Sequence, residues 1–526
     1  MAYIICMQGK KHYTEKLFTS FQLSDRVPEE NIYRRLKETL DLSFLLSETK
    51  KYYGAEGQKS IDPVVFFKLI LIGYLENLNS DRKIIAHASM RLDILFFIGY
   101  DIDEELPWHS TLSRTRELYG EEVFKSLFKK ILSLCVSKGM VSGKRQAIDS
   151  AYIKANASMD SLAEKEVLAD GDIYTEELRA NDETGQTVST QKQKQVQQHH
   201  NWKAKEYKNQ SRIKKNNNGA LDEFGSNIRP KFLSNHTHYS KTDPDARISV
   251  KPGKPRQFNY SAQTSVDTKN HVITNIMADF SDKRDSQSLP KAIEQTIENL
   301  KENDLHLKEV LADSGYSSGT ALKYLKEKNI EGYIPNFGLY KNEREGFTYD
   351  SQSDEYTCSQ GKKLTFKKTF DHKDHQSREY GSTTQDCKDC PLKKSCIGKS
   401  PRKKITHSAD KIYYDEMYQR LKTDKAKRLK KQRSSTVEPV LGTLINFMGM
   451  RRVWTRGIKS ANKFFIGAAI AYNLKKWLNW ETKSKQKNNQ ASVKMKSKSF
   501  INITSGIINN CEGLILRYFM KYNFQC

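Results

Sequence analysis

The chain has 526 residues, of which 88 are Lys or Arg and 63 are Asp or Glu, so its formal net charge is +25 and its sequence pI is about 9.4. This length predicts two to four structural units, and the charge favours a polyanionic partner, nucleic acid first, over a neutral or acidic one. No stretch reaches the roughly 20 apolar residues of a membrane helix, and Met1 to Lys11 lacks a signal-peptide pattern, so we expect a cytoplasmic, nucleoid-associated protein with no membrane partner.

Residues 1–140 are predicted to form a helical domain. Apolar residues crowd the stretch DPVVFFKLILIGY at helical length, and further apolar segments follow it. The segment PWHSTLSRTREL then offers a Ser-Thr cap ahead of a helix that carries Arg114 and Arg116, an arrangement in which a helix N-terminal turn can meet phosphate. A DNA-binding module and an ordinary helical bundle with a basic face both agree with these residues.

Residues 141–160 and 256–336 are predicted to form an α/β core. The run RQAIDSAYIKA has the character of a strand and contains Asp149, and two further strand-like runs joined by a short turn predict a hairpin. A helix, the apolar run KEVLADSGY with Asp313 near its end, a second helix and the strand EGYIPN follow. The order β, β, β, α, β, α, β is typical of a mixed sheet covered by helices.

Three other segments differ from this core in composition. Residues 161–255 are rich in Gln, Lys, Asn, Ser and His, which predicts a polar, basic and partly disordered insertion. Residues 337–410 hold four cysteines and form a second insertion. Residues 411–480 combine a basic segment with helical patterns, and residues 481–526 are a lysine-rich linker with an apolar tail.

Two acidic residues of the core are candidates for chemistry. Asp149 and Asp313 lie within or just after apolar strands, where a charge is costly unless it is paired or binds a ligand. Hard cations such as Mg²⁺ prefer oxygen ligands, and two divalent ions can assist an in-line phosphoryl displacement. A turn or helix cap is the alternative interpretation for either residue taken alone.

Three sequence blocks resemble the catalytic blocks of the DDE transposases of bacterial insertion sequences. They are AIDSAYIKA, VLADSGYSS and the block that begins STVEPVLGTLINFMGMRRVW, and the segment from Ile61 to Arg116 with its PWHSTLSR block is similar to the amino-terminal region of that family. The resemblance implies a ribonuclease-H-like mixed sheet flanked by helices, with an α-helical amino-terminal domain and insertions. It also implies that Asp149, Asp313 and Glu438 are catalytic and bind two Mg²⁺ or Mn²⁺ ions.

The activity implied by the resemblance is metal-dependent DNA cleavage and strand transfer at the ends of an insertion sequence. The partners would be double-stranded DNA, comprising the terminal inverted repeats and the target, and further copies of the chain in a dimer or higher multimer. Two alternatives stay open: a non-catalytic DNA-binding repressor derived from a transposase, and a ribonuclease-H-like nuclease that cuts without joining.

The third block departs from the family pattern in its basic residues. The family places an Arg one turn before the Glu and a Lys two turns after it, and this chain has Ser434 and Ile445 there. Arg433 is a candidate replacement for the former. Pro439 is compatible with a first helical turn, with Thr436 as a candidate cap, and the start of the helix that carries Glu438 stays open. The expected DNA-contacting set is Arg114, Arg116, Lys427, Arg428, Lys430, Lys431, Arg433, Arg451, Arg452, Trp454, Arg456 and Lys459.

Four of the eight cysteines are clustered in the second insertion. Cys358, Cys387, Cys390 and Cys396 have the spacing Cys-x28-Cys-x2-Cys-x5-Cys, and the CxxC half is a common zinc-binding feature. A structural Zn²⁺ site is one interpretation. Four reduced, unligated cysteines are the other.

Overall fold

The computed structural model describes residues 20–164, 238–249 and 256–481, apart from a few single positions within these ranges, together with residues 14, 15, 18 and 235. The described chain divides into two compact units. One contains residues up to 72 with 80–118, and the other contains 73–79 with residues from 119 onward. Most of the predicted polar insertion 161–255, and all of the tail from residue 482, lie outside the described residues.

The first unit is helical, as predicted. Its longest apolar helix, α4, starts at Pro63, a residue suited to a first helical turn. Residues on both faces of α4 are buried in the protein, which agrees with the apolar character of the helix on all sides. Helix α6 ends at Gly99, whose φ of 91° is the left-handed conformation that closes a helix. The elements are α1 (Leu23–Arg26), α2 (Ile32–Thr39), α3 (Phe44–Thr49), η1 (Lys50–Tyr52), α4 (Pro63–Leu75), α5 (Asp81–Ser89), α6 (Leu92–Ile98) and α7 (His109–Leu118).

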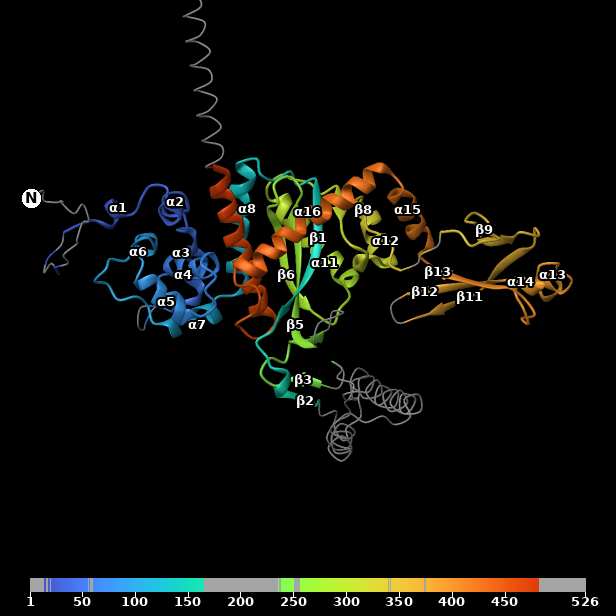
Figure 1. Cartoon of the computed structure of the whole chain (residues 1–526), viewed down its shortest axis with the longest axis horizontal. Helices are drawn as coiled ribbons and strands as arrows, with labels where there is room; N and C mark the ends of the chain where they lie inside the picture. Colours follow the sequence, from blue (N-terminus) through green and yellow to red (C-terminus); the bar gives the residue numbers. More distant parts are fainter. Residues whose placement is uncertain are drawn as a thin grey trace, which may run out of the picture. The chain divides into compact units, whose positions relative to one another are not determined.

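A six-stranded mixed sheet forms the centre of the second unit (Figure 1). Its order is β4-β5-β1-β7-β8, and β6 pairs with the same edge of β5 as β4. The strands β1, β5 and β6 are antiparallel neighbours, whereas β7 runs parallel to β1 and β8 parallel to β7. The strands are β1 (Arg145–Lys154), β4 (Arg247–Ser249), β5 (Gln257–Asp267), β6 (Ile273–Phe280), β7 (Glu309–Leu311) and β8 (Glu331–Tyr333). The predicted hairpin is β5–β6.

Helices cover this sheet, and two of them define its two faces near the middle of β1. Ile148 packs with Leu289 and Ile293 of α11, whereas the next residue, Asp149, contacts α16. Since successive residues of a strand point to opposite faces, α11 and α16 lie on opposite sides of β1. The helices are α8 (Glu121–Ser137), α11 (Asp285–Lys301), α12 (Gly319–Glu327), α15 (Lys411–Leu421), α16 (Asp424–Phe447) and a final helix over residues 458–481.

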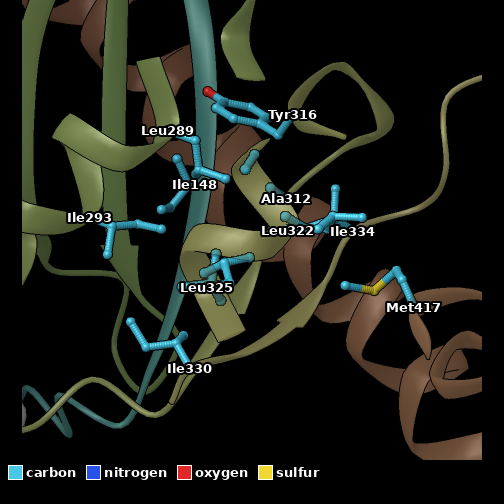
Figure 2. Close-up of a cluster of buried hydrophobic side chains, with 12 residues drawn as sticks. Ile148, Leu289, Ile293, Ala312, Tyr316, Leu322, Leu325, Ile330, Ile334 and Met417 are labelled. Atoms are coloured by element: carbon cyan, nitrogen blue, oxygen red, sulfur yellow. The ribbon is translucent and has the colours of Figure 1, made fainter. Parts of the chain in front are cut away.

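The core on the α11 side joins β1, β7, α11, α12 and α15 with the short helix η3, residues Ser314–Tyr316 (Figure 2). Ile148 of β1, Leu289 of α11, Leu322 of α12 and Met417 of α15 belong to one buried cluster. Tyr316 closes this cluster from η3, directly after β7. The packing fixes where β7 ends and therefore where Asp313 lies.

The predicted cysteine-bearing insertion contains its own antiparallel sheet of order β13-β12-β11-β10-β9. Tyr356, Leu364, Tyr380 and Ile405 form its small core. The elements are β9 (Phe347–Asp350), β10 (Glu355–Cys358), β11 (Lys363–Asp371), β12 (Gln376–Gly381), α13 (Thr384–Lys388), α14 (Lys393–Cys396) and β13 (Lys404–Ser408). A separate ribbon pairs β2 (Leu162–Glu164), which follows η2 (Met159–Ser161), with β3 (His238–Ser240).

The helix that carries Glu438 begins earlier than a first turn at Pro439 would place it. Helix α16 begins at Asp424, with the Thr423 side chain capping the amide of Ala426, and Pro439 lies inside it. Thr436 is not a cap but a buried residue of this helix. The basic stretch and the third block are therefore one continuous helix, because apolar positions of α16 keep packing on the sheet on both sides of Pro439.

Among the helices that the structure describes, none combines the length and apolar character needed to cross a lipid bilayer.

Candidate active site

The strand register brings two of the three predicted acids together. In the parallel pair β1–β7, Gln146 lies beside Val310 and Ala147 beside Leu311. Beyond Leu311 the chain leaves the strand, and the Asp313 carboxylate caps η3 by accepting a hydrogen bond of 2.9 Å from the Gly315 amide, while its charge still acts on Asp149. Because β7 stops at Leu311, the edge of β1 is open at Asp149. Two residues separated by 164 positions in the sequence thus meet where one strand ends and its neighbour continues.

Glu438 reaches this pair through an arginine. The Arg433 guanidinium donates from Nη1 to Asp149 Oδ2 at 2.8 Å and from Nη2 to Glu438 Oε1 at 3.3 Å. The side chains of Arg433 and Asp149 are 15% and 17% exposed, and that of Glu438 is 58% exposed. Arg433 therefore holds a mostly exposed acid next to a mostly buried one.

Contacts along α16 set the position of this helix over the sheet. Lys425 Nζ lies 2.8 Å from Glu309 Oε1 at the start of β7. Two turns later, Gln432 accepts a hydrogen bond of 3.0 Å from Arg145 at the start of β1. Together with the Arg433–Asp149 pair, these contacts align one side of α16 with β1 and β7, so Glu438 is carried to the open edge beyond β7.

The negative charges of the site raise the pKa of Asp149 and of a neighbouring tyrosine. Burial raises the pKa of Asp149, and the negative charge of Asp313 raises it further, while the guanidinium of Arg433 lowers it. Burial also raises the pKa of Tyr316 well above its usual value, with further contributions from the carboxylates of Asp285, Asp149 and Asp313. Asp285 thus belongs to the same group of acids, although the sequence patterns did not single it out.

A buried hydrogen-bond network fixes Asp285, the first residue of α11. The Tyr316 hydroxyl donates to Gln263 Oε1 at 2.5 Å, and Gln263 Nε2 donates to Asp285 Oδ1 at 2.8 Å and to Ser261 Oγ at 3.1 Å. Tyr316 is fully buried and Gln263 is 1% exposed. From the sequence alone, an acid at the first position of a helix is expected to interact with the helix dipole. Only the contact with Gln263 distinguishes Asp285 from such a residue.

A second unpredicted residue, Thr264, lies across the ladder from Asp149. The two are directly paired in β1–β5, so their side chains share the face covered by α16. Thr264 is fully buried, and its hydroxyl has no hydrogen-bond partner within the described part of the chain. An orphaned buried hydroxyl beside a carboxylate is a ready contact for a further polar ligand or a hydrated ion.

Within the residues that the structure describes, no three His, Cys, Asp or Glu side chains converge in a position to hold a metal ion. At the acidic site, the Arg433 guanidinium occupies the position between Asp149 and Glu438. In the insertion, Cys358 packs beside the small apolar core, and the Cys387 thiol contacts Ser382 Oγ at 3.1 Å. All four cysteines of the predicted zinc cluster are free thiols and partly exposed.

The insertion sheet should lose stability in mild acid because of His407. Burial, followed by the positive charge of Lys411, lowers the pKa of His407 to about 4, and its Nδ1 shares a hydrogen bond of 2.7 Å with the Tyr356 hydroxyl. In the unfolded chain the histidine binds a proton near pH 6.5, but in the folded protein it does so only near pH 4. The contribution of neutral His407 to stability is therefore complete above pH 6.5 and is lost as the pH falls toward 4. After discounting for solvent exposure, we expect a loss of about 1–2 kcal/mol.

Hydrogen exchange of the β10–β13 amides between pH 7 and 4.5, corrected for intrinsic rates, measures this effect. The variant His407→Gln removes the titrating group, so the difference in protection between the two pH values should shrink relative to the wild type. An equal pH dependence in both proteins would contradict the assignment to His407.

The predicted DNA-contacting residues fall into two groups. Three of the arginines are engaged by the protein itself: Arg116 binds Asp81 with both terminal nitrogens, Arg433 binds the acids, and Arg452 donates to Asn156 at 3.0 Å. Trp454 is 40% exposed and lies under the Arg452 guanidinium. The exposed cations are Arg114, Lys427, Arg428, Lys430, Lys431, Arg451, Arg456 and Lys459.

Two comparisons with protein families give matches. Residues 21–118 match the family described as transposase domain (DUF772), and residues 357–478 match the family described as transposase DDE domain. The second match includes Glu438 and the four clustered cysteines, while Asp149 and Asp313 precede it. No curated protein and no solved structure matches the chain.

Proposed function

Because the chain belongs to the DDE transposases of insertion sequences, we propose that it cuts DNA at the ends of its element and joins the 3′ ends to a target duplex. The observation that supports this proposal is the Arg433 guanidinium, which contacts both Asp149 and Glu438, while the charge of Asp313 acts on Asp149. A sheet with three antiparallel strands, then two parallel ones beside β1, agrees with a ribonuclease-H-like core.

Asp149, Asp313 and Glu438 offer the oxygen ligands that divalent cations prefer, and DDE transposases generally use such ions. The negative charge of Asp313 raises the pKa of Asp149, and Thr264, paired with Asp149 across the ladder, offers a hydroxyl that has no partner among the described residues. Two Mg²⁺ or Mn²⁺ ions would activate the attacking oxygen and stabilise the leaving one. Asp149, Asp313 and Glu438 would hold the ions. The positive charge of the ions would weaken the attraction between these acids and Arg433, so Arg433 would leave one of the two carboxylates that it contacts.

The cysteine cluster is a separate proposal. Cys358, Cys387, Cys390 and Cys396 would hold a structural Zn²⁺. Their thiols are free and partly exposed, which leaves them available as ligands. Zinc content of the purified protein, with Cys387→Ser as the comparison, tests it: a stoichiometric Zn²⁺ that survives this substitution would contradict the assignment.

DNA would approach the acids along α16. Lys427, Arg428, Lys430 and Lys431 are exposed on the same helix as Glu438, and the seven residues from Lys431 to Glu438 span about 10 Å of helix. Phosphates bound there would place the scissile bond near the acids, with the helical amino-terminal unit reading the element ends. Pairing of two ends would require a dimer or higher multimer.

The deciding experiment offers the full chain a duplex that carries the element's own ends, a target plasmid, and Mg²⁺ or Mn²⁺. Joined products support a transposase, and nicked DNA without joining supports the nuclease alternative. Binding without any product supports the repressor alternative. The assay therefore separates all three functions in one gel.

The double variant Lys430→Ala/Lys431→Ala should bind the element ends more weakly and with a smaller salt dependence. Each lost phosphate contact reduces the slope of log K against log salt by about 0.9, so two should reduce it by about 2. Fluorescence anisotropy at several salt concentrations measures the slope. Lys323→Ala/Lys326→Ala on α12, whose lysines pair with Glu327 and Glu416, is the matched control. An unchanged slope in the α16 variant would remove these lysines from the DNA surface.

A further inference from the structure

We propose that a basic cleft at the end of α16 binds the backbone of the DNA duplex on the opposite side of the scissile bond from the α16 cations. This inference rests on the proposed function and adds a second DNA-contacting surface to it. The cleft lies where the β5–β6 turn, the end of α16 and the helix over residues 458–481 meet. The α16 cations are Lys427, Arg428, Lys430 and Lys431.

The basic cleft combines cationic side chains with an aromatic wall. It has a volume of about 530 Å³, and no Asp or Glu is among the described residues that line it. The lining side chains that can carry a charge near pH 7 are those of Lys269, His271, Lys475 and Lys476. The Trp480 ring, 37% exposed, lies on the same wall. Lysines that meet phosphates, with an aromatic ring beside the sugars and bases, are the features of a surface that follows a nucleic-acid backbone.

The acids closest to the cleft in sequence do not neutralise its charge. The fully buried carboxylate of Asp267 accepts hydrogen bonds from backbone amides of the segment that enters β1. Glu481, at the other end of the cleft sequence, lies 3.7 Å from Lys138. Lys475 is exposed and has no acidic partner within the described residues. The positive charge of the cleft is therefore available to a polyanion.

The cleft and the α16 cations lie on opposite sides of Glu438 along one helix, which crosses the sheet from α15 toward the last helix (Figure 1). Thr443, which borders the cleft, follows Glu438 by about 7.5 Å of helix. On the sheet, Lys269 follows Thr264, the ladder partner of Asp149, by about 17 Å of chain. A duplex with its scissile phosphate at the acids would thus reach the cleft within about five nucleotides.

The segment of the chain that follows Glu481 does not suit this cleft by charge. Residues 482–499 contain six lysines and no acid, so they would be repelled by a basic surface. DNA is the polyanion that the proposed function already brings to the neighbouring acids.

Salt-dependent binding of the full chain to the element-end duplex tests the proposal. Lys475→Ala/Lys476→Ala should reduce the slope of log K against log salt by about 2, because two phosphate contacts are lost. Lys475→Ala alone changes only an exposed side chain and should reduce the slope by about 1. The α12 variant Lys323→Ala/Lys326→Ala removes the same charge elsewhere and should leave the slope unchanged.

Duplexes that end at the scissile bond show on which side the cleft binds. On the duplex shortened on one side, the cleft variants should bind as the wild type does, while Lys430→Ala/Lys431→Ala keeps its reduced slope. On the duplex shortened on the other side, the opposite should hold. If both surfaces lose their effect on the same shortened duplex, or if the cleft variants never change the slope, the inference is overturned while the proposed function stands. If the α16 variant also leaves every slope unchanged, the DNA path of the proposed function fails too.

Measurements without DNA separate this role from two others. The cleft variants should keep the melting temperature of the wild type and its mass in sedimentation experiments, because the lysines are assigned to DNA and not to the fold or to another copy. A cleft variant that changes the oligomeric state while its salt slope equals that of the wild type would assign the cleft to a contact between copies and overturn the proposal.

Discussion

Asp149→Asn should reduce metal-dependent cleavage of the element ends by at least about a thousandfold, which corresponds to several kcal/mol of transition-state stabilisation. The asparagine keeps the size and one hydrogen-bond acceptor of the native side chain, so β1 and its ladder with β5 should persist. The substitution removes the negative charge of Asp149, which interacts with Asp313 and with Arg433. Asp313→Asn and Glu438→Gln should have effects in the same direction, measured as single-turnover cleavage rates with Mg²⁺ or Mn²⁺.

Binding to the same duplex is the control for this series. All three variants should retain the affinity of the wild type, because phosphate contacts are assigned to the exposed cations of α16 and not to the acids. Activity that survives in all three would show that the chemistry occurs elsewhere. Loss of binding together with activity would point to misfolding, which the melting temperature of each variant checks.

Asp267→Ala should lower the unfolding free energy of the second unit, which contains the six-stranded sheet, by about 3–5 kcal/mol. Asp267 is fully buried at the end of β5, and its carboxylate accepts hydrogen bonds from the amides of Ser142, Gly143 and Lys269 and from the Gln146 side chain. Alanine would leave these donors without a partner in the interior. The contacts tie the chain that enters β1 to the β5–β6 turn.

Urea denaturation followed by tryptophan fluorescence measures this loss, since Trp477 of the last helix is buried in the same unit. Asp267→Asn retains one acceptor oxygen and should lose less. Glu327→Ala, an exposed acid of α12, should leave the urea midpoint unchanged. A midpoint for Asp267→Ala equal to that of the wild type would mean that water replaces the carboxylate.

The sequence was sufficient for the elements with strong local patterns. The apolar helix α4, the strand around Asp149, the β5–β6 hairpin and the strand before Asp313 all follow from hydrophobic periodicity and turn residues. Asp149 and Asp313 were candidates from their strand positions, but the catalytic role of all three acids rests on the resemblance, because a single acid at a strand end does not differ locally from a cap. The sequence also left the start of α16 open: Pro439 suits a first turn, and only packing on the sheet shows that the helix runs through it.

Charge pairing also required the tertiary structure. Arg116, a predicted DNA contact, pairs with Asp81, and Arg433, the candidate replacement for the family arginine, bridges Asp149 and Glu438. Asp285 had no local signature at all. Which partner a charged side chain meets depends on elements that are far away in sequence.

The sequence by itself thus determined the chemistry that this chain can carry: a basic surface, strand-borne acids and a helical amino-terminal unit. The tertiary structure decided which acids share a space, because the parallel register of β1 with β7 and the end of β7 two residues before Asp313 arise from packing between segments more than 160 residues apart. Local propensities act over a few residues, and no local pattern encodes a register between distant strands.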